Sequence, residues 1–161
     1  MLHRGFVLLF VALLLAGPVA AETGSVGAII VKPLALTETS PLEFGQLSST
    51  DSGGTVVLDS SDGRAATGGA TLDGGTVQSG TWSVSGEPAT AYTISLPDDD
   101  VILTSGSDSM TVNNFTDSEG GSATTDANGS DSFKVGATLN VGANQADGAY
   151  SGSYEVTVAY Q

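Results

Sequence analysis

The last fourteen residues of the chain constrain its fold most, because their side chains alternate between two kinds. One set is polar, and the other is aromatic, β-branched or glycine: Tyr150, Gly152, Tyr154, Val156, Val158 and Tyr160. Successive side chains of a strand point to opposite faces, so this stretch predicts a half-buried strand. Such a strand must be held by pairing with another strand. Its pairing partner is the main functional question.

The rest of the chain also has an all-β pattern. It contains 22 glycines, and its short alternating runs are separated by clusters of Gly, Asp, Ser and Asn rather than by a period of 3.6 residues. We therefore expect a two-sheet β-sandwich of about eight to ten strands. Besides residues 148–161, the expected strands are 26–36, 42–47, 55–58, 81–85, 91–96, 101–104, 109–115 and 133–141.

Within this pattern, several details can be compared directly with a structure. Trp82 has the parity of a core residue. In residues 133–141, one parity is apolar throughout and predicts the buried face: Phe133, Val135, Ala137, Leu139 and Val141. Residues 37–41 are expected to form a turn and residues 48–54 a loop. Residues 59–75 predict an irregular crossover with short pairings around Ala65 and Thr71.

The first 21 residues have the three parts of a secretory signal. A basic head precedes an apolar run at residues 6–16, and small residues follow up to Ala21. The run is shorter than the roughly 20 residues that span a bilayer. We therefore expect cleavage after Ala21, export by the Sec route and no stable membrane insertion afterwards. Residues 22–161 would form a single domain.

The charge and the missing residue types exclude several functions. After residue 21 three cations face eighteen acids, so we expect neither nucleic acid nor anionic membrane as a partner. The chain has no cysteine, and its one histidine, His3, lies in the signal. Triads built on His or Cys and zinc sites of the same residues are therefore excluded. We expect no enzyme, no catalytic residue and no cofactor.

Acidic stretches at residues 98–100 and 117–131 are the remaining candidates for a ligand site. Clustered carboxylates suit Ca²⁺, but the spacing of an EF-hand is absent. We expect solvated turns there and no metal site.

Three stretches together resemble a known bacterial family. They are VGAIIVKPLALTETSPLEFGQL at residues 26–47, TWSVSGEPATAYTISLP with the later MTVNNF, and FKVGATLNVGANQADGAYSGSYEVTVAYQ at residues 133–161. The chain resembles the family catalogued as domain of unknown function 4402 over nearly all of residues 22–161. That family is similar to pilin-type domains, which include spore coat protein U-like proteins and chaperone–usher fimbrial subunits. The resemblance implies an immunoglobulin-like, pilin-type sandwich.

The likeness to fimbrial subunits concentrates at the end of the chain. Those subunits commonly carry a glycine fourteen residues from the end and a penultimate tyrosine, and here Gly148 and Tyr160 occupy these positions. Their last strand borders a groove left by a missing strand. A chaperone strand fills the groove first, and the N-terminal strand of the next subunit follows. Backbone pairing supplies affinity in this mode, and alternate side chains enter pockets.

Carried over to this chain, the resemblance implies two assembly strands. The C-terminal one comprises Gly148, Tyr150, Tyr154, Val156, Val158 and Tyr160, and the N-terminal one comprises Val26, Ala28, Ile30, Leu34 and Leu36. The alternative is that residues 26–36 complete the sheet of their own domain, which Lys32 and Pro33 favour slightly. The disulfide of many fimbrial subunits is absent.

The expected function is therefore that of a secreted, non-enzymatic structural or adhesion protein, a fimbria-like or surface-assembly subunit. Its partners would be copies of itself or other fimbria-like subunits, with a periplasmic chaperone and an outer-membrane usher. It would lie in the periplasm or at the surface of a Gram-negative-type bacterium. The alternative is a self-contained, monomeric extracellular module that binds sugar or calcium.

Overall fold

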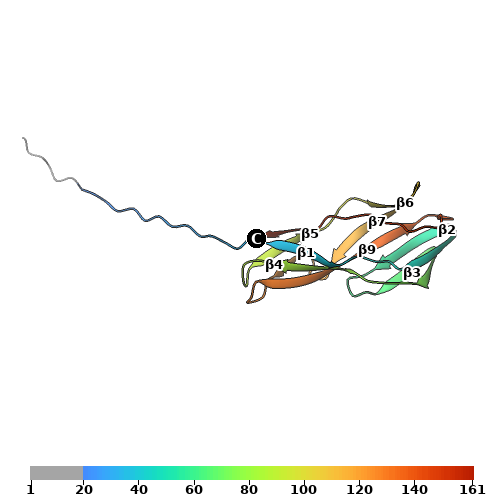
Figure 1. Cartoon of the computed structure of the whole chain (residues 1–161), viewed down its shortest axis with the longest axis horizontal. Helices are drawn as coiled ribbons and strands as arrows, with labels where there is room; N and C mark the ends of the chain where they lie inside the picture. Colours follow the sequence, from blue (N-terminus) through green and yellow to red (C-terminus); the bar gives the residue numbers. More distant parts are fainter. Residues whose placement is uncertain (1–19) are drawn as a thin grey trace, which may run out of the picture. The chain divides into compact units, whose positions relative to one another are not determined.

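The computed structural model describes residues 20–161, and within that range it contains strands and no helix. Ten strands form two antiparallel sheets. Figure 1 labels most of the strands of the larger sheet, among them β2, β7 and β9. Residues Val31–Gln161 form one compact unit, and the described residues before them do not belong to it. The expected signal at residues 1–21 lies, except for its last two residues, outside the described residues. Among the described residues, no helix is long and apolar enough to cross a bilayer.

The larger sheet has seven strands and is built around β9. The strands of the domain are β1 (Ala35–Ser40), β2 (Gln46–Leu58), β3 (Arg64–Gly74), β4 (Gly80–Ser85), β5 (Ala91–Ser95), β6 (Val101–Ser105), β7 (Asp108–Asp117), β8 (Ser122–Thr124), β9 (Ser130–Val141) and β10 (Thr157–Tyr160). The first half of β9 pairs with β4 and its second half with β2, while β7 lies along its other edge. Beyond these lie β1, β3 and β6. The smaller sheet has the order β10-β5-β8, so the predicted two-sheet, all-β sandwich is confirmed.

The central strand β9 buries the face that its alternation predicts. All five apolar residues of that face are at most 7% exposed: Phe133, Val135, Ala137, Leu139 and Val141. Gly136 lies against the backbone of Leu58 and Asp59, and a Cβ there would collide with the Leu58 carbonyl oxygen. A side chain is therefore excluded at this one position between two closely paired strands.

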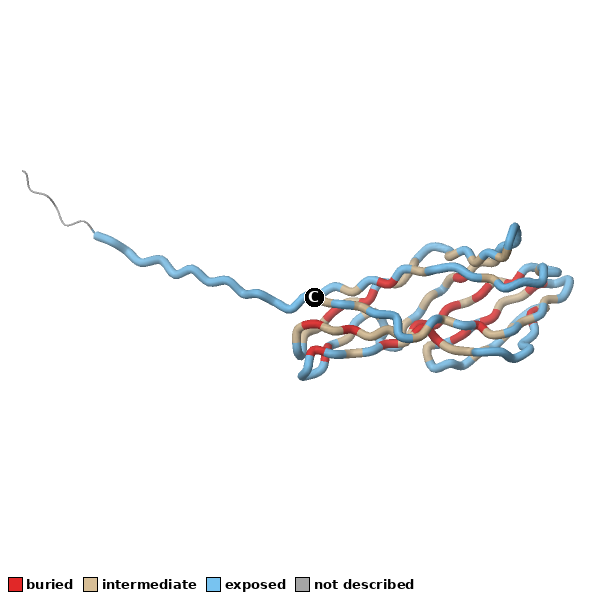
Figure 2. Tube along the Cα trace, in the orientation of Figure 1, coloured by how far each residue is buried: buried red, intermediate tan, exposed pale blue. Residues whose placement is uncertain are grey.

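The core consists of two clusters, and only one of them lies between the two sheets. The first cluster joins the large sheet to β5 and the segment that leads into β10: Val84, Tyr92, Ile94, Phe133, Val135 and Val156. The second cluster belongs to the other half of the large sheet: Phe44, Val56, Leu58, Ala70, Val112, Ala137, Leu139 and Val141. Figure 2 shows buried residues in both halves. No residue of the smaller sheet contributes to the second cluster or to the apolar side chains packed on it. Within residues 20–161, half of the large sheet's apolar face therefore has no second sheet over it.

The N-terminal strand starts later than predicted. Residues 26–34 are in no strand, and β1 begins at Ala35 and runs through residues 37–40, which were expected to form a turn. Residues 35–38 and 40 pair with β4. Pro33 has no backbone N–H to donate to a ladder, and residues 26–34 have no ladder beside them. The prediction of a continuous strand over residues 26–36 is therefore wrong for all but its last two residues.

A long hairpin replaces two segments that were predicted to be irregular. Residues 48–54 and 59–75 lie mostly in β2 and β3, which pair from Gln46↔Gly74 to Leu58↔Arg64 with a bulge in between. The predicted pairings around Ala65 and Thr71 are confirmed. The acidic stretch at residues 117–131 also holds a short strand, β8, which the sequence pattern did not predict.

The closing stretch keeps its predicted faces but not its predicted length as a strand. Val156 is buried, and the other large side chains of the same parity are half-buried: Tyr150, Tyr154, Val158 and Tyr160. Only β10 is paired, with β5. Residues 148–156 are in no ladder apart from one isolated bridge between Ser151 and Thr104. Trp82, expected in the core, is half-buried beside the first cluster.

Candidate functional site

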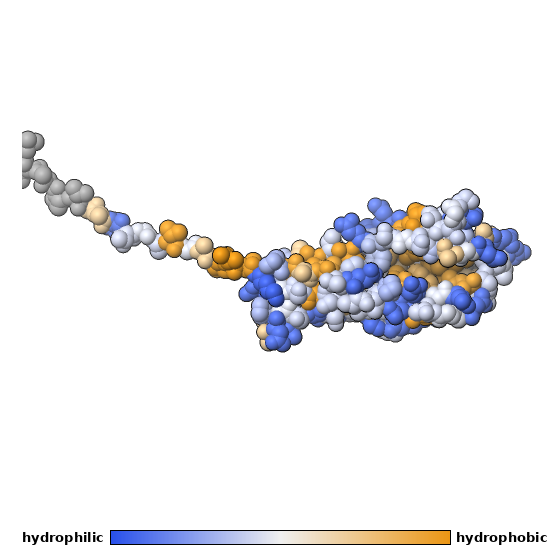
Figure 3. All heavy atoms as spheres, viewed as in Figure 1, coloured by the Kyte–Doolittle hydropathy of each residue, from blue (hydrophilic) through white to orange (hydrophobic). Residues whose placement is uncertain are grey.

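An apolar groove lies over the half of the large sheet that lacks a second sheet. Its floor is formed by side chains of β6, β7 and β9: Val101, Leu103, Met110, Val112, Phe115, Leu139 and Val141. Its two rims are residues 41–49 and residues 145–154, and its cavity volume is about 980 Å³. Figure 3 shows apolar atoms gathered in a hollow over the region of β7 and β9. We call this site the groove.

The rims are held at opposite edges of the sheet by backbone pairing. On the β2–β3 side, Glu43 and Gln78 exchange backbone hydrogen bonds of 2.7 and 3.0 Å. On the β6 side, Thr104 and Ser151 exchange bonds of 2.9 and 3.1 Å. The floor strands β9, β7 and β6 lie between the rims, and their two inter-strand spacings make roughly 10 Å. That width leaves room for an added strand above the floor.

The C-terminal rim continues into a stretch of unpaired backbone. Within the described chain, residues 152–156 form no backbone hydrogen bond, although Tyr154 is half-buried and Val156 is buried. Backbone N–H and C=O groups are almost always paired when they can be, so this stretch has the properties of an open strand edge. The Tyr154 and Val156 side chains are therefore held by the first core cluster, while the backbone of residues 152–156 remains available for pairing.

Three aromatic rings close the groove where it meets the first core cluster. The Trp82 indole N–H donates to the Tyr154 hydroxyl at 3.1 Å, and the two rings meet edge-on with centroids 6.0 Å apart. Phe115 stacks on Tyr154 at 5.2 Å. Burial raises the pKa of Tyr154, so its hydroxyl stays neutral and the end of the groove stays uncharged.

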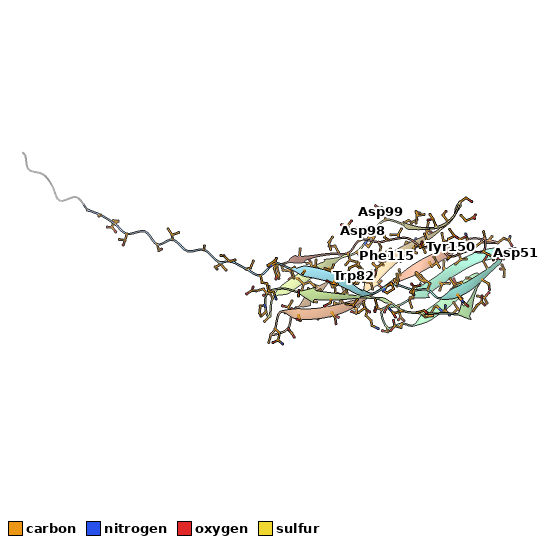
Figure 4. The ribbon with its side chains drawn as sticks, in the orientation of Figure 1. Asp51, Trp82, Asp98, Asp99, Phe115 and Tyr150 are labelled. Atoms are coloured by element: carbon orange, nitrogen blue, oxygen red, sulfur yellow. The ribbon has the colours of Figure 1, made fainter. Side chains whose placement is uncertain are left out.

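Tyr150 lines the groove away from Trp82 and Phe115. Its hydroxyl accepts a hydrogen bond of 2.7 Å from the Gln145 side chain and donates one of 2.8 Å to the Ala146 carbonyl oxygen. In Figure 4 the labelled Trp82, Phe115 and Tyr150 follow one another along the length of the domain. The groove is therefore elongated, with an aromatic side chain at intervals along it.

The N-terminal segment before β1 is apolar and exposed. Four large hydrophobic residues precede the domain, with exposed fractions of 100% for Val26, 92% for Ile29, 96% for Ile30 and 55% for Val31. Lys32 is the first residue of this segment with a hydrogen bond to the rest of the domain. The segment thus has the length and composition of a strand but lacks a partner strand in the described chain.

The residues expected to form the two assembly strands lie in different environments: some pack in the core, some line the groove and some are exposed. In the N-terminal set, Leu34 and Leu36 pack on the first core cluster of their own domain, whereas Val26, Ala28 and Ile30 are exposed. In the C-terminal set, Gly148, Tyr150 and Tyr154 line the groove, whereas Val156, Val158 and Tyr160 belong to the first core cluster or pack on it. The sequence pattern did not single out the groove's other rim or its floor, because nothing in a single strand shows whether a second sheet covers it.

The acidic side chains organise turns. Asp117 and Asp126 each accept backbone N–H groups of the turn that follows them, and these bonds lower the pKa of Asp126. Asp100 accepts a hydrogen bond from the Asn113 side chain. Among residues 20–161, no three His, Cys, Asp or Glu side chains come together in a way that could hold a metal ion.

One carboxylate fastens three parts of the domain to one another. Asp62 accepts hydrogen bonds from the Ser79 backbone and hydroxyl at 2.8 and 2.6 Å and from the Lys134 ammonium at 2.6 Å. The Lys134 ammonium, followed by Ser79, holds the pKa of Asp62 well below its usual range. The contact joins the β2–β3 turn to the start of β4 and to β9, so it stabilises the large sheet where β4 pairs with β9.

The comparisons with known proteins agree with the extent of this domain. The family model described as domain of unknown function (DUF4402) matches residues 34–160. No curated protein and no solved structure gives a match to the chain. The matched region contains the whole groove and begins after the exposed residues 26–31.

Proposed function

The chain belongs to the DUF4402 family, whose description names no activity, and from this premise we propose that it is a non-enzymatic structural subunit. It assembles with other subunits by pairing β-strands, in the manner of fimbria-like or other surface assemblies. It is exported by the Sec route and works in the periplasm or at the cell surface. In this proposal its sandwich is of the immunoglobulin-like, pilin type.

The groove is the single observation that carries this proposal. It combines an apolar floor, a second core cluster without a covering sheet and the unpaired backbone of residues 152–156. An extended segment placed there would pair with the open edge and bury alternate side chains against the floor, which is the physical basis of β-augmentation. A groove of this kind suits a strand better than a sugar or an ion, because its floor carries apolar side chains.

The exposed N-terminal segment has the chemistry of the strand that is missing. Val26, Ala28 and Ile30 share one parity, and burying a valine or isoleucine side chain stabilises by roughly 1.5–3 kcal/mol. Exposed apolar segments are a source of aggregation unless they have a binding site. The groove provides that site, and copies of this chain or related subunits are the partners.

Export imposes a further requirement in this proposal. A subunit with an empty groove and a free apolar segment would associate prematurely, so a periplasmic chaperone would cover the groove and an outer-membrane usher would direct assembly. The resemblance to chaperone–usher subunits favours this arrangement.

The experiment is to measure the mass of residues 22–161 by size-exclusion chromatography with light scattering over about 1–100 µM. We expect oligomers whose size grows with concentration. Leu103→Asp on the floor of the groove, or Ile30→Asp in the N-terminal segment, should leave monomers that still unfold cooperatively. Ile102→Asp is the matched control, because Ile102 is 50% exposed and does not line the groove. A wild-type chain that stays monomeric throughout would refute the proposal.

A further inference from the structure

The border of the groove carries acids and no cations. Of the described residues that line it, none is lysine or arginine and four are acidic: Glu38, Glu43, Asp73 and Asp147. All four of these acidic residues are exposed. Figure 3 shows hydrophilic residues beside the apolar hollow. The site therefore combines an apolar floor with a border of four formal negative charges.

The four acids are distributed around the groove. Glu38 lies at its aromatic end, because it pairs with Trp82 across β1 and β4. Glu43 and Asp73 border the groove on the β2–β3 side, and Asp147 belongs to the C-terminal rim. An extended segment in the groove would therefore meet negative charge along both of its sides and towards both of its ends.

These four carboxylates differ from the acids that organise turns. Asp62, Asp117 and Asp126 accept hydrogen bonds from neighbouring backbone or side-chain groups. In the part of the chain that the structure describes, the carboxylates of the four groove acids accept no hydrogen bond and form no ion pair. Their charges are therefore not compensated within the domain, and they can act on a bound partner.

The cations of the domain are engaged elsewhere. Arg64 lies behind the rim at residues 41–49, where its Nη1 donates to the carbonyl oxygens of Phe44 and Gly74 at 2.6 and 3.3 Å. Lys134 forms its ion pair with Asp62. The third cation after residue 21 is Lys32, and none of the three lines the groove. Positive charge complementary to the groove must therefore come from another molecule.

The exposed N-terminal segment of a second copy supplies little of this charge. Residues 23–31 contain no charged side chain, Glu22 precedes them and Lys32 follows. Two copies, each with eighteen acids and three cations after residue 21, also repel one another at long range. A segment with the same apolar pattern and a cation at each end would instead oppose the acids at both ends of the groove.

We propose that the four groove acids select a particular kind of partner: a different subunit whose extended segment has alternate apolar residues flanked at both ends by Lys or Arg. This inference rests on the proposed function of the groove and adds the charge of the preferred occupant. The apolar floor supplies affinity for any such strand, including the uncharged one of a copy. The acids determine specificity, because complementary charge speeds encounter and discriminates between partners more than it adds affinity.

The test compares three synthetic peptides that share one apolar core. Each contains residues 24–31, flanked at both ends by two Lys, two Ser or two Glu, and is titrated onto the Ile30→Asp chain at low salt. The readout is the emission of Trp82, which is the only tryptophan and lines the groove. An exposed ion pair changes affinity by a factor of about 1.5 to 5, so we expect the lysine peptide to bind about ten-fold more tightly than the serine peptide.

The salt dependence and the third peptide extend the same test. The glutamate peptide should bind about ten-fold more weakly than the serine peptide, since like charges then face one another. At about 0.5 M salt, screening should reduce the difference between the lysine and serine peptides to less than about two-fold. Equal affinities of these two peptides at low salt would overturn the inference.

A combined variant assigns the preference to the groove. It carries Glu38→Gln, Glu43→Gln, Asp73→Asn and Asp147→Asn, and it should bind the lysine and serine peptides with affinities within about two-fold of each other. The matched control removes the same number of charges outside the groove, at four exposed acids that accept no hydrogen bond: Glu22→Gln, Asp98→Asn, Asp99→Asn and Asp108→Asn. It should keep most of the ten-fold preference, and melting curves check that both combined variants are folded. A preference that survives in the first variant would show attraction to the overall negative charge and would also overturn the inference.

The peptides also separate this inference from the proposed function. If the serine and lysine peptides bind equally well, the inference fails and the function of the groove stands. If no peptide binds and the wild-type chain is monomeric, the proposed function itself fails.

Discussion

Two adjacent isoleucines offer the sharpest test of strand donation. Ile29 and Ile30 are 92% and 96% exposed in the free chain, so neither contributes to the stability of its own domain. In a donated strand their side chains point to opposite faces, and the parity of Val26, Ala28 and Ile30 places Ile30 on the groove floor and Ile29 in solvent. Ile30→Ala and Ile29→Ala should therefore differ in their effect, although the residues are identical and neighbouring.

The size of the difference follows from the buried area. Alanine has three fewer carbon atoms than isoleucine, and each buried methylene contributes about 0.8 kcal/mol, so Ile30→Ala should weaken association by about 2.4 kcal/mol, or about 50-fold in Kd. Ile29→Ala should change association by less than about 0.5 kcal/mol, which is about two-fold. Because both values are differences, the unknown cost of ordering the segment cancels.

Sedimentation equilibrium of residues 22–161 as wild type and as the two variants gives the three association constants directly. Melting curves serve as the control, since neither substitution should change the stability of the isolated domain. Equal losses for the two variants would refute a strand in the groove and indicate an unstructured hydrophobic contact. A loss confined to Ile29→Ala would show a register shifted by one residue, with the opposite face of the segment on the floor.

Two further predictions concern the domain that carries the groove. Lys134 lowers the pKa of Asp62 in the folded state. The stabilisation that this carboxylate provides is therefore present above the unfolded-state pKa of about 3.8, and it is lost as the pH falls through that value and towards the folded-state pKa. Asp62→Asn should lower the melting temperature at pH 7, and the melting temperature of the variant should fall less steeply between about pH 4 and pH 2 than that of the wild type. Leu139 is 2% exposed, so Leu139→Ala should lower the free energy of unfolding in urea by about 2–5 kcal/mol. Val57 is 42% exposed, so Val57→Ala should lower the same free energy by less than about 1 kcal/mol. Equal losses of free energy would contradict the assignment of Leu139 to the buried face and Val57 to the exposed face.

The parts of the fold that the sequence predicts are those in which large side chains alternate. In β9, five apolar residues of one parity fix both the strand and its buried face. The pattern predicts the pairings around Ala65 and Thr71 but not the full length of the β2–β3 hairpin, because the residues of the hairpin are small. The pairs Thr55–Thr67 and Ser48–Thr71 stabilise this ladder through backbone bonds and hydroxyl contacts. Such residues give no hydrophobic period, so glycine-rich strands and glycine-rich loops have the same pattern in the sequence.

The groove itself could not be predicted from any single strand. Met110 and Val112 of β7 alternate with polar residues in the same way as Tyr92 and Ile94 of β5, which pack between the two sheets. Whether an apolar face is covered depends on the course of the whole chain, and here the smaller sheet covers only the first core cluster. Alternation therefore identifies core-facing residues without showing what lies opposite them.

The two remaining errors lie at the two ends of the domain and have one physical cause. Residues 26–34 and residues 148–156 both have strand-like patterns, and both lack a ladder in the described chain. Intrinsic preference alone does not form a strand, because the backbone groups need a partner strand. In residues 152–156 the Tyr154 and Val156 side chains are already packed and the backbone lacks pairing, whereas residues 26–31 lack both packing and pairing. In the proposed assembly, the open edge at residues 152–156 of one copy and the exposed segment at residues 26–31 of another would supply the two halves of a single ladder.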